Sequence, residues 1–341
     1  MRTVETELLG VNGVSIQKAA MLLRSGKLVG IPTETVYGLA ANACDADAVA
    51  GIFKVKGRPQ DNPLIVHISG LDMLADVAAL VPPAARKLAA AFWPGPLTMV
   101  LPRGKSMPDV VSAGMDTVGV RMPSHPAALA VIKAAGVPLA APSANLSGSP
   151  SPTTAEHVKE DFNGRIPLIL DGGPCQVGVE STVISLVGQP TVLRPGYITP
   201  QQLQEALGQE VKLSPALTRP LQEGEKPTSP GMKYRHYAPK AELTLVRGSF
   251  KSFEEMMEEK RAPGVFALCF EGEQGRLPVP AIAYGIEENA VSQAAELYAA
   301  LRRLDDMGAH TVYARMPQTQ GVGLAVYNRM LRAAAFREIE V

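Results

Sequence analysis

Cations and turn-forming residues gather in one short stretch of the chain. Residues 54–64 read KVKGRPQDNPL, and Lys54, Lys56 and Arg58 stand where an expected helix ends. Cations at a helix end complement its exposed carbonyls and contribute ~0.3–1 kcal/mol, so capping alone could explain them. The segment 59–63 that follows has polar residues between two prolines, and a helix end that needed only a cap would not require them. The pattern therefore favours a binding site for a polyanion such as a phosphate chain.

A second polar loop follows an apolar strand about 80 residues later. Residues 140–148 read AAPSANLSG. Open α/β sheets bind ligands beyond the carboxyl ends of their strands. Small residues there let backbone amides approach phosphate oxygens, and Ser143 and Asn145 add side-chain groups. An ordinary Ser/Asn/Gly turn is the alternative. Neither a Walker A loop nor a Gly-x-Gly-x-x-Gly fingerprint occurs, so a nucleotide would be bound in another way.

Single polar residues also stand at or near strand ends. Arg121 lies in an otherwise apolar strand and needs an anion, either a structural carboxylate or the carboxylate of a ligand. Arg194 is likewise an arginine at the end of an apolar strand. Ser181 could face the same ligand-binding cleft as these arginines. His67 ends the expected buried strand that follows segment 59–63, and His236 also lies in a motif context. No two histidines have metal-ligand spacing, so we expect no metal site built from protein side chains.

Composition narrows the class of protein. The 341 residues include 33 cations and 33 carboxylates, so the net charge is zero and general attraction to nucleic acid is not expected. Cys44, Cys175 and Cys269 are far apart and form no zinc or disulfide pattern, which fits a reducing compartment. The N-terminus lacks the apolar core of a signal peptide, and Lys133, Gly136 and prolines interrupt the apolar residues 127–144. We therefore expect a cytoplasmic protein without a membrane span.

Helices and strands alternate along the chain, which predicts a mixed α/β domain with one large twisted sheet. We expect domain boundaries at 1–206, 207–240 and 241–341, the middle segment being a proline-rich linker and the last a smaller α/β domain. The expected helices are 15–24, capped by Ser15, then one opened by Asp45 or Asp47, 125–135, 289–307 and 324–335. The expected strands are 28–31, 64–68, 97–101, 118–122, 138–141, 167–170, 181–186, 191–193, 243–246, 265–270 and 311–314.

Six segments in order resemble one family, the YrdC-type L-threonylcarbamoyladenylate synthases. The linker segment 229–239, SPGMKYRHYAP, followed by a small domain, resembles the longer two-domain form. The resemblance implies a YrdC-like twisted mixed sheet with flanking helices and a smaller, Rossmann-like C-terminal domain. The six segments are 33–39 (TETVYGL), 56–58 (KGR), 62–64 (NPL), 93–98 (WPGPLT), 142–145 (PSAN) and 180–182 (EST).

The resemblance implies a synthase that joins L-threonine, bicarbonate and ATP. Its products would be threonylcarbamoyl-AMP and pyrophosphate, with Mg2+ required alongside ATP. A separate transferase would then use the product to modify adenosine 37 of tRNA. An RNA-binding module and a carbamoyl-transfer enzyme are the alternatives. Zero net charge argues against tight nucleic-acid binding, and the chain lacks the acylphosphatase-like and zinc-finger parts of the hydrogenase-maturation carbamoyltransferases.

The family's site residues carry over by position. Neither step of the reaction needs a protein nucleophile; both need positioning and stabilisation of phosphoryl charge. Because carbamates are labile in water, we expect a closed site, with residues 234–237 of the linker folding over it. The implied catalytic residues are Lys56, Arg58, Ser143 and Asn145; those for ATP are Arg58, Asn62, Thr117, Ser143, Ser151, Arg194 and His236; those for L-threonine are Thr35, His67, Arg121, Ala141 and Ser181.

Overall fold

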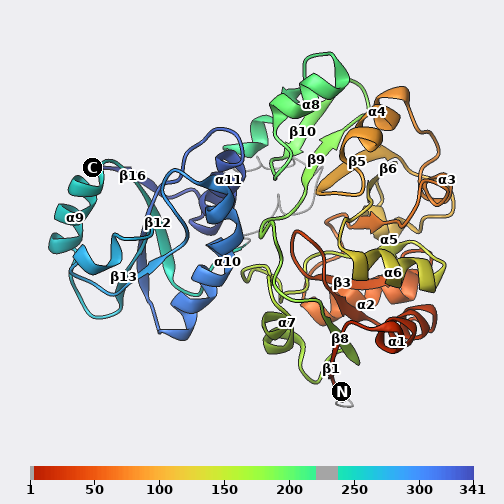
Figure 1. The fold of residues 1–341 in the computed structure, drawn as a ribbon, viewed down its shortest axis with the longest axis horizontal. Coiled ribbons are helices and arrows are strands. Elements are labelled where there is room, and N and C mark those ends of the chain that lie inside the picture. Colours follow the sequence, from red (N-terminus) through yellow and green to blue (C-terminus); the bar gives the residue numbers. More distant parts are fainter. Residues whose placement is uncertain (1–3, 220–236) are drawn as a thin grey trace.

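Two β-sheets, one in each half of the chain, organise the structure. This computed structural model describes residues 4–219 and 237–341. An eleven-stranded sheet forms the centre of the larger, N-terminal part, and a five-stranded sheet the centre of the smaller one. Figure 1 shows the two parts side by side. The expected mixed sheet with flanking helices and a smaller second α/β domain is confirmed.

The first sheet mixes parallel and antiparallel strands. In chain order its strands are β1 (Glu7–Gly10), β2 (Val29–Ile31), β3 (Gly38–Asn42), β4 (Ile65–His67), β5 (Leu97–Pro102), β6 (Thr117–Arg121), β7 (Leu139–Ala140), β8 (Leu168–Asp171), β9 (Thr182–Ser185), β10 (Thr191–Arg194) and β11 (Lys212–Leu213). Their spatial order is β1-β8-β2-β3-β7-β4-β6-β5-β9-β10-β11. The last strand lies in the segment expected as a linker, yet it pairs with β10 and extends the first sheet.

Helices cover this sheet and enclose its core. They are α1 (Gly13–Arg24), α2 (Ala46–Lys56), α3 (Leu74–Val77), α4 (Pro83–Phe92), α5 (Asp109–Ser112), α6 (Pro126–Ala135), α7 (Ala155–Phe162) and α8 (Pro200–Leu207). One apolar cluster, which includes Phe53, Leu88 and Phe162, lies on the side of α2 and α4. A second cluster, with Leu23 and Ile132, lies under α1 and α6.

Caps fix where the helices near the site begin and end. The expected cap Ser15 is corrected to Asn12, whose side chain accepts hydrogen bonds from the amides of Val14 and Ser15. Ser15 instead accepts a hydrogen bond from the Asn12 amide, so it is the inner member of a capping box. Asp45 caps α2 as expected. Gly57 ends α2 with φ +65°, a left-handed conformation that glycine adopts without strain.

The second sheet is wholly parallel. Its order is β14-β13-β15-β12-β16, which gives the domain the expected Rossmann-like character. Helices α10 and α11 lie on the side facing the first domain, and α9 lies on the far side (Figure 1). In chain order, the helices and strands of this second domain are β12 (Glu242–Arg247), α9 (Phe250–Glu259), β13 (Val265–Cys269), β14 (Ala281–Ala283), α10 (Ala290–Asp306), β15 (Thr311–Arg315), α11 (Gly323–Ala333) and β16 (Glu338–Glu340).

Polar side chains of α10 and α11 reach into the first domain. Arg302 of α10 pairs with Asp161 at 2.9 Å, and Asn328 of α11 donates to the Leu217 carbonyl at 2.7 Å. The approach is close at Gly178, where an added Cβ would lie 2.3 Å from the Ala294 carbonyl oxygen. The two domains are therefore held by specific contacts as well as by the chain that connects them.

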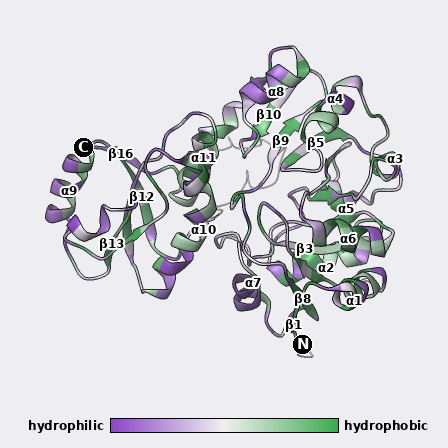
Figure 2. Ribbon diagram, in the orientation of Figure 1, coloured by the Kyte–Doolittle hydropathy of each residue, from purple (hydrophilic) through white to green (hydrophobic). Residues whose placement is uncertain are grey.

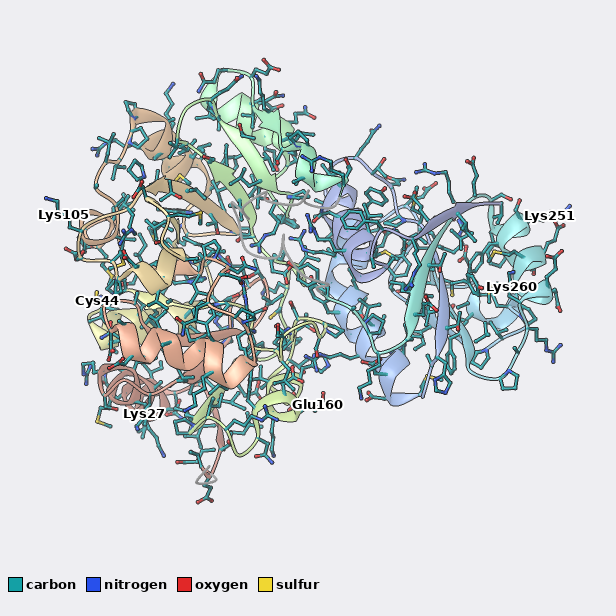
Figure 3. All side chains as sticks on the ribbon, turned by 180° about the vertical axis from the view of Figure 1, so that it is seen from behind. Lys27, Cys44, Lys105, Glu160, Lys251 and Lys260 are labelled. Carbon is teal, nitrogen blue, oxygen red and sulfur yellow. The ribbon has the colours of Figure 1, made fainter. Side chains whose placement is uncertain are left out.

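Hydropathy follows this arrangement. Apolar residues concentrate in the strands, and polar ones cover the outer faces of helices such as α9 (Figure 2). Charged side chains such as Lys27, Lys105 and Lys251 point away from the molecule in Figure 3. Within the described ranges, no helix is both long and apolar enough to cross a membrane.

Candidate active site

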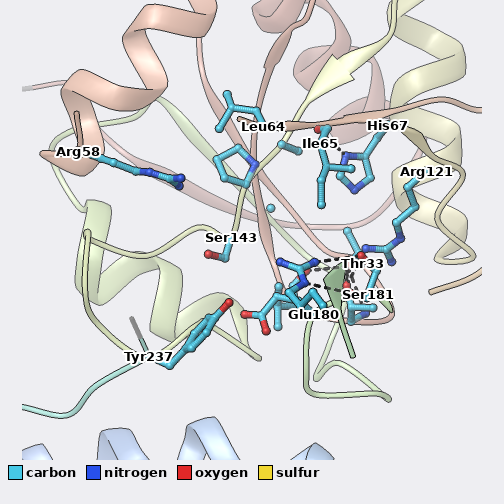
Figure 4. A pocket seen from close by; sticks show the side chains of 16 residues that line it. Thr33, Arg58, Leu64, Ile65, His67, Arg121, Ser143, Glu180, Ser181 and Tyr237 are labelled. Atoms are coloured by element: carbon cyan, nitrogen blue, oxygen red, sulfur yellow. Dashed lines mark hydrogen bonds between the residues drawn. The ribbon is translucent and has the colours of Figure 1, made fainter. Parts of the chain in front are cut away.

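A pocket lies over the middle strands of the first sheet. The register pairs His67 of β4 with Arg121 of β6 and with Leu139 of β7, so the ends of these short strands meet. The loops between β2 and β3, after α2, after β7 and before β9 surround them, as Figure 4 shows. The lining residues are Thr33, Thr35, Val36, Gly38, Arg58, Leu64, Ile65, His67, Arg121, Ala141, Pro142, Ser143, Glu180, Ser181, Arg194 and Tyr237.

Arg121 has an anionic partner within the protein. Its guanidinium pairs with a Glu34 carboxylate oxygen at 2.6 Å and donates to Thr35 Oγ1 at 2.9 Å. Burial alone would raise the pKa of Glu34, but the charge of Arg121, together with hydrogen bonds from Arg121 and from backbone amides, holds that pKa below its ordinary value. Arg121 thus has the structural carboxylate that the sequence left as one alternative, and it also lines the pocket.

His67 is a neutral ring in the pocket wall. It is 3% exposed, and its Nδ1 lies 3.3 Å from the Ile65 carbonyl oxygen. Burial, with the nearby charge of Arg121, lowers its pKa to about 3. Near neutral pH the imidazole therefore offers a hydrogen bond to a ligand and carries no charge.

Ser181 and Arg194 form a unit at the start of β9 and the end of β10. Arg194 donates to the Ser181 carbonyl at 3.1 Å and to Ser181 Oγ at 3.2 Å. The same hydroxyl lies 2.8 Å from Thr98 Oγ1. Arg194 therefore fixes the strand end that presents Ser181 and places a cation in the pocket.

The implied catalytic residues come from two segments, 56–58 and 142–145, which meet in the structure. Lys56, however, does not line the pocket. Its ammonium donates to the Ser143 and Asn145 carbonyls, both at 2.5 Å, from behind the loop. Burial, together with the charge of Arg58, lowers its pKa well below the ordinary value. The Asn145 side chain also faces the loop: it accepts from Ser143 Oγ at 2.6 Å and donates to the Ser149 carbonyl. Lys56 and Asn145 thus shape the loop, while Arg58 and Ser143 face the cavity.

The remaining residues expected around ATP lie at different depths. Asn62 is fully buried, and both polar atoms of its side chain lack a hydrogen-bond partner among the described residues. Thr117 lines a smaller adjoining pocket that shares Leu64 and Ile65 with the main one. Ser151 lies behind the wall and donates to the Glu180 carboxylate at 2.6 Å. His236 is outside the described residues, as are 234–235 of the expected lid.

Half of the lining residues were not among the expected catalytic, ATP or threonine residues, and two of these are Glu180 and Tyr237. Glu180 is 7% exposed and stands just before Ser181. Tyr237, the first described residue after the gap, also lines the pocket, with φ +65°. A signal for Glu180 was present, because a carboxylate directly before a buried strand needs a partner. The sequence did not show where that partner lies.

Over the ranges 4–219 and 237–341, no group of three His, Cys, Asp or Glu side chains could hold a metal ion. Glu180 lines the pocket and pairs with Arg329, and Glu34 pairs with the lining residue Arg121. A divalent cation reaching this pocket would therefore depend on ligands other than these carboxylates.

The fold and the pocket define an α/β enzyme whose larger domain has a pocket lined by arginine side chains. A family model described as "Telomere recombination" matches residues 21–196, and one described as "Threonylcarbamoyl-AMP synthase, C-terminal domain" matches residues 198–335. The threonylcarbamoyl-AMP synthase of Bacillus subtilis is 45% identical over 339 residues, covering 98% of this chain and 97% of that protein. The Pyrococcus abyssi enzyme is also 45% identical, covering 96% of each.

Solved structures agree with the sequence relatives. The Sua5 protein of P. abyssi in complex with L-threonine superposes with a TM-score of 0.91 at 42% identity, covering 98% of this chain and 99% of that one. The chain belongs to the threonylcarbamoyl-AMP synthase family, in its two-domain form, and is an enzyme that makes an AMP-linked product. The resemblance seen in the six sequence segments is therefore confirmed.

Proposed function

We propose that this chain joins L-threonine, bicarbonate and ATP to give threonylcarbamoyl-AMP and pyrophosphate. The observation that supports it most directly is one pocket that combines a polar end with a cationic end. The polar end has Thr35, His67 and Arg121, and the cationic end has Arg58 and Arg194. A single cavity with both ends could hold the amino acid and the triphosphate side by side.

The polar end suits an amino acid. Arg121 has N–H groups beyond those used by Glu34 and Thr35, and a guanidinium binds a carboxylate in a two-point geometry. The neutral His67 and the Ser181 hydroxyl offer further hydrogen bonds, and Ala141 supplies apolar contact. The P. abyssi relative, whose solved structure contains L-threonine, supports threonine as the ligand.

The cationic end suits the triphosphate. Arg58, Arg194 and Ser143 line it, and Ser151 and Thr117 are close behind. Cations placed before the reaction stabilise charge that develops on phosphoryl oxygens. Mg2+ would enter with ATP, held by the phosphate oxygens, because the nearest carboxylates are occupied by arginines. Chelation with EDTA should abolish turnover, and added Mg2+ should restore it.

The chemistry has two steps, and neither uses a protein nucleophile. First, the threonine amine attacks the carbon of bicarbonate; a C–N bond forms, water leaves, and a carbamate results. Second, a carbamate oxygen attacks the α-phosphorus of ATP; the bond to the β-phosphate oxygen breaks, and pyrophosphate leaves. The residues that line the pocket align the reactants and keep water away from the carbamate.

The product is a reactive mixed anhydride, which a further enzyme must consume. We propose that a tRNA threonylcarbamoyl transferase takes it for modification of adenosine 37. A cytoplasmic location is consistent with the three thiols, Cys44, Cys175 and Cys269, all of which are free.

Pyrophosphate release tests the proposal. The purified protein is given ATP, bicarbonate and Mg2+, with and without L-threonine. We expect release only with threonine, together with an adduct of the mass of threonylcarbamoyl-AMP. Release without threonine, or none with it, would contradict the synthase assignment. Salt-titrated RNA binding would then test the alternative of an RNA-binding module.

A further inference from the structure

The wall of the pocket contains a carboxylate that the proposed reaction does not need. Glu180 lies on the side of the cavity nearest the helices of the second domain (Figure 4). A carboxylate that faces a site for a triphosphate repels the ligand unless its charge is neutralised. What neutralises Glu180 therefore matters for ATP.

Two of the side chains that offset the charge of Glu180 come from the second domain. Arg329 of α11, which is completely buried, donates from Nε to one Glu180 carboxylate oxygen at 2.6 Å. The hydroxyl of Tyr298 in α10 donates to the carboxylate at 2.8 and 3.1 Å. Burial alone would raise the pKa of Glu180, but Arg329 and then Arg194 lower it below its ordinary value. The carboxylate is thus charged and paired.

The same contacts fix the backbone and side chains around the ATP end. Arg329 also donates to the carbonyls of Glu180, at 3.3 Å, and Pro195, at 3.0 Å, which are next to Ser181 and Arg194. These two segments already pack closely, because a Cβ on Gly196 would lie 2.3 Å from the Thr182 amide nitrogen. On the other side, Glu180 accepts the hydrogen bond from Ser151.

The end of the linker meets the same group. The ring of Tyr237 lies 5.6 Å from the ring of Tyr298, and the Arg329 guanidinium stands 5.5 Å from the Tyr237 ring centre. Tyr237 itself lines the pocket. One buried arginine therefore contacts two pocket segments and the linker residue that follows the gap.

We propose that Arg329 and Tyr298 are positioning residues for ATP, acting through Glu180, and that the second domain thereby completes the nucleotide end of the pocket. The proposal rests on the function proposed above. Arg329 offsets the negative charge that would face the phosphates, and Glu180 in turn orients Ser151. The threonine end has its own cation and carboxylate, Arg121 and Glu34, which pair with each other.

Direct binding measurements test this on the full chain. ATP with Mg2+ and L-threonine are titrated separately into the wild type and Arg329→Met by calorimetry. We expect at least tenfold weaker ATP binding and less than threefold change for threonine. Arg332→Met is the matched control, since Arg332 is also a buried arginine of α11 that bonds across the interface, to the Ala216 carbonyl at 2.8 Å. It should leave ATP affinity within twofold.

The double variant Glu180→Gln/Arg329→Met separates charge from packing. If the charge of Glu180 is what Arg329 offsets, removing both charges should restore ATP affinity to within about threefold of the wild type. Unchanged ATP binding in Arg329→Met would overturn the proposal. So would a loss shared equally by threonine, or one that the double variant does not relieve.

Tyr298→Phe covers the case in which Arg329→Met does not fold. It keeps the ring against Tyr237 and removes only the hydroxyl, and we expect at least threefold weaker ATP binding. A change below twofold would count against the proposal. Because ATP binding is read directly, a wild type that binds ATP but releases no pyrophosphate would overturn the proposed function and leave this coupling standing.

Discussion

Replacing Lys56 tests whether this cation acts on the substrates or on the loop beside them. Its ammonium donates to the Ser143 and Asn145 carbonyls and is 4% exposed. Hydrogen bonds to charged groups contribute ~1.5–3 kcal/mol each, and burial of the ammonium offsets part of that gain. We therefore expect Lys56→Met to lower the free energy of unfolding by about 2–4 kcal/mol. Lys54→Met, two residues earlier on an exposed part of α2, should change it by less than about 0.5 kcal/mol.

Turnover supplies the second measurement. Since the loop that presents Ser143 would lose its support, we expect kcat/KM for ATP to fall as well, by about tenfold or more, which is ~1.4 kcal/mol of transition-state stabilisation. Urea unfolding and pyrophosphate release on the same preparations give both quantities. A variant with unchanged unfolding free energy and a loss of turnover above about a hundredfold would refute this reasoning, because the ammonium would then act on the substrates.

Three further predictions follow from neighbouring contacts. Arg121→Lys keeps a charge beside Glu34 but loses the two-point geometry of a guanidinium. KM for threonine should therefore rise about tenfold, while KM for ATP and the unfolding midpoint change little. An unchanged KM for threonine would remove Arg121 from the threonine site. The folded pKa of His67, about 3, is below its unfolded value, so the unfolded chain binds the extra proton between pH 6.5 and 3. The stability due to the neutral ring is complete above pH 6.5 and declines by up to ~1.4 kcal/mol per pH unit as the pH falls. In His67→Gln, the free energy of unfolding measured with urea should depend less on pH over this range. Gly178→Ala should destabilise the protein by at least about 2 kcal/mol more than Gly173→Ala. Both glycines have φ near +80°, but of the two only Gly178 faces the Ala294 backbone. Equal unfolding midpoints in calorimetry would mean that this approach of the two domains tolerates a methyl group.

The short motifs predicted most of the pocket wall. Arg58, Ser143, Ser181 and Arg194 came from separate segments, and all of them line one cavity. The alternation of helices and strands predicted the two-sheet architecture, because period and turn residues are local signals. Helices such as α7 and α9 were not anticipated, although Thr154 and Ser249 cap them. These helices are short, and the cap was their main local signal.

What the sequence did not predict depends on distant contacts. Its spacing placed Lys56 at a helix end but did not show which way the ammonium points, which is decided by carbonyls 87 and 89 residues later. Two partners of Glu180 are Tyr298 and Arg329, which are 118 and 149 positions away. Such pairs arise only when two domains pack, and no motif in either domain records them. The mistaken cap at Ser15 was a smaller error, since Asn12 is only three residues away.

The separation between Glu180 and Arg329 has a consequence for the order in which the protein is made. A chain is synthesised from its N-terminus, and domains fold as they emerge. The first sheet is complete by Leu213, but the arginine that neutralises Glu180 arrives only with the last helix. A chain that terminates before α11 would leave Glu180 with Ser151 and Arg194 but without Arg329. If Arg329 positions the ATP end as proposed, chains that lack α11 would bind ATP more weakly than complete ones.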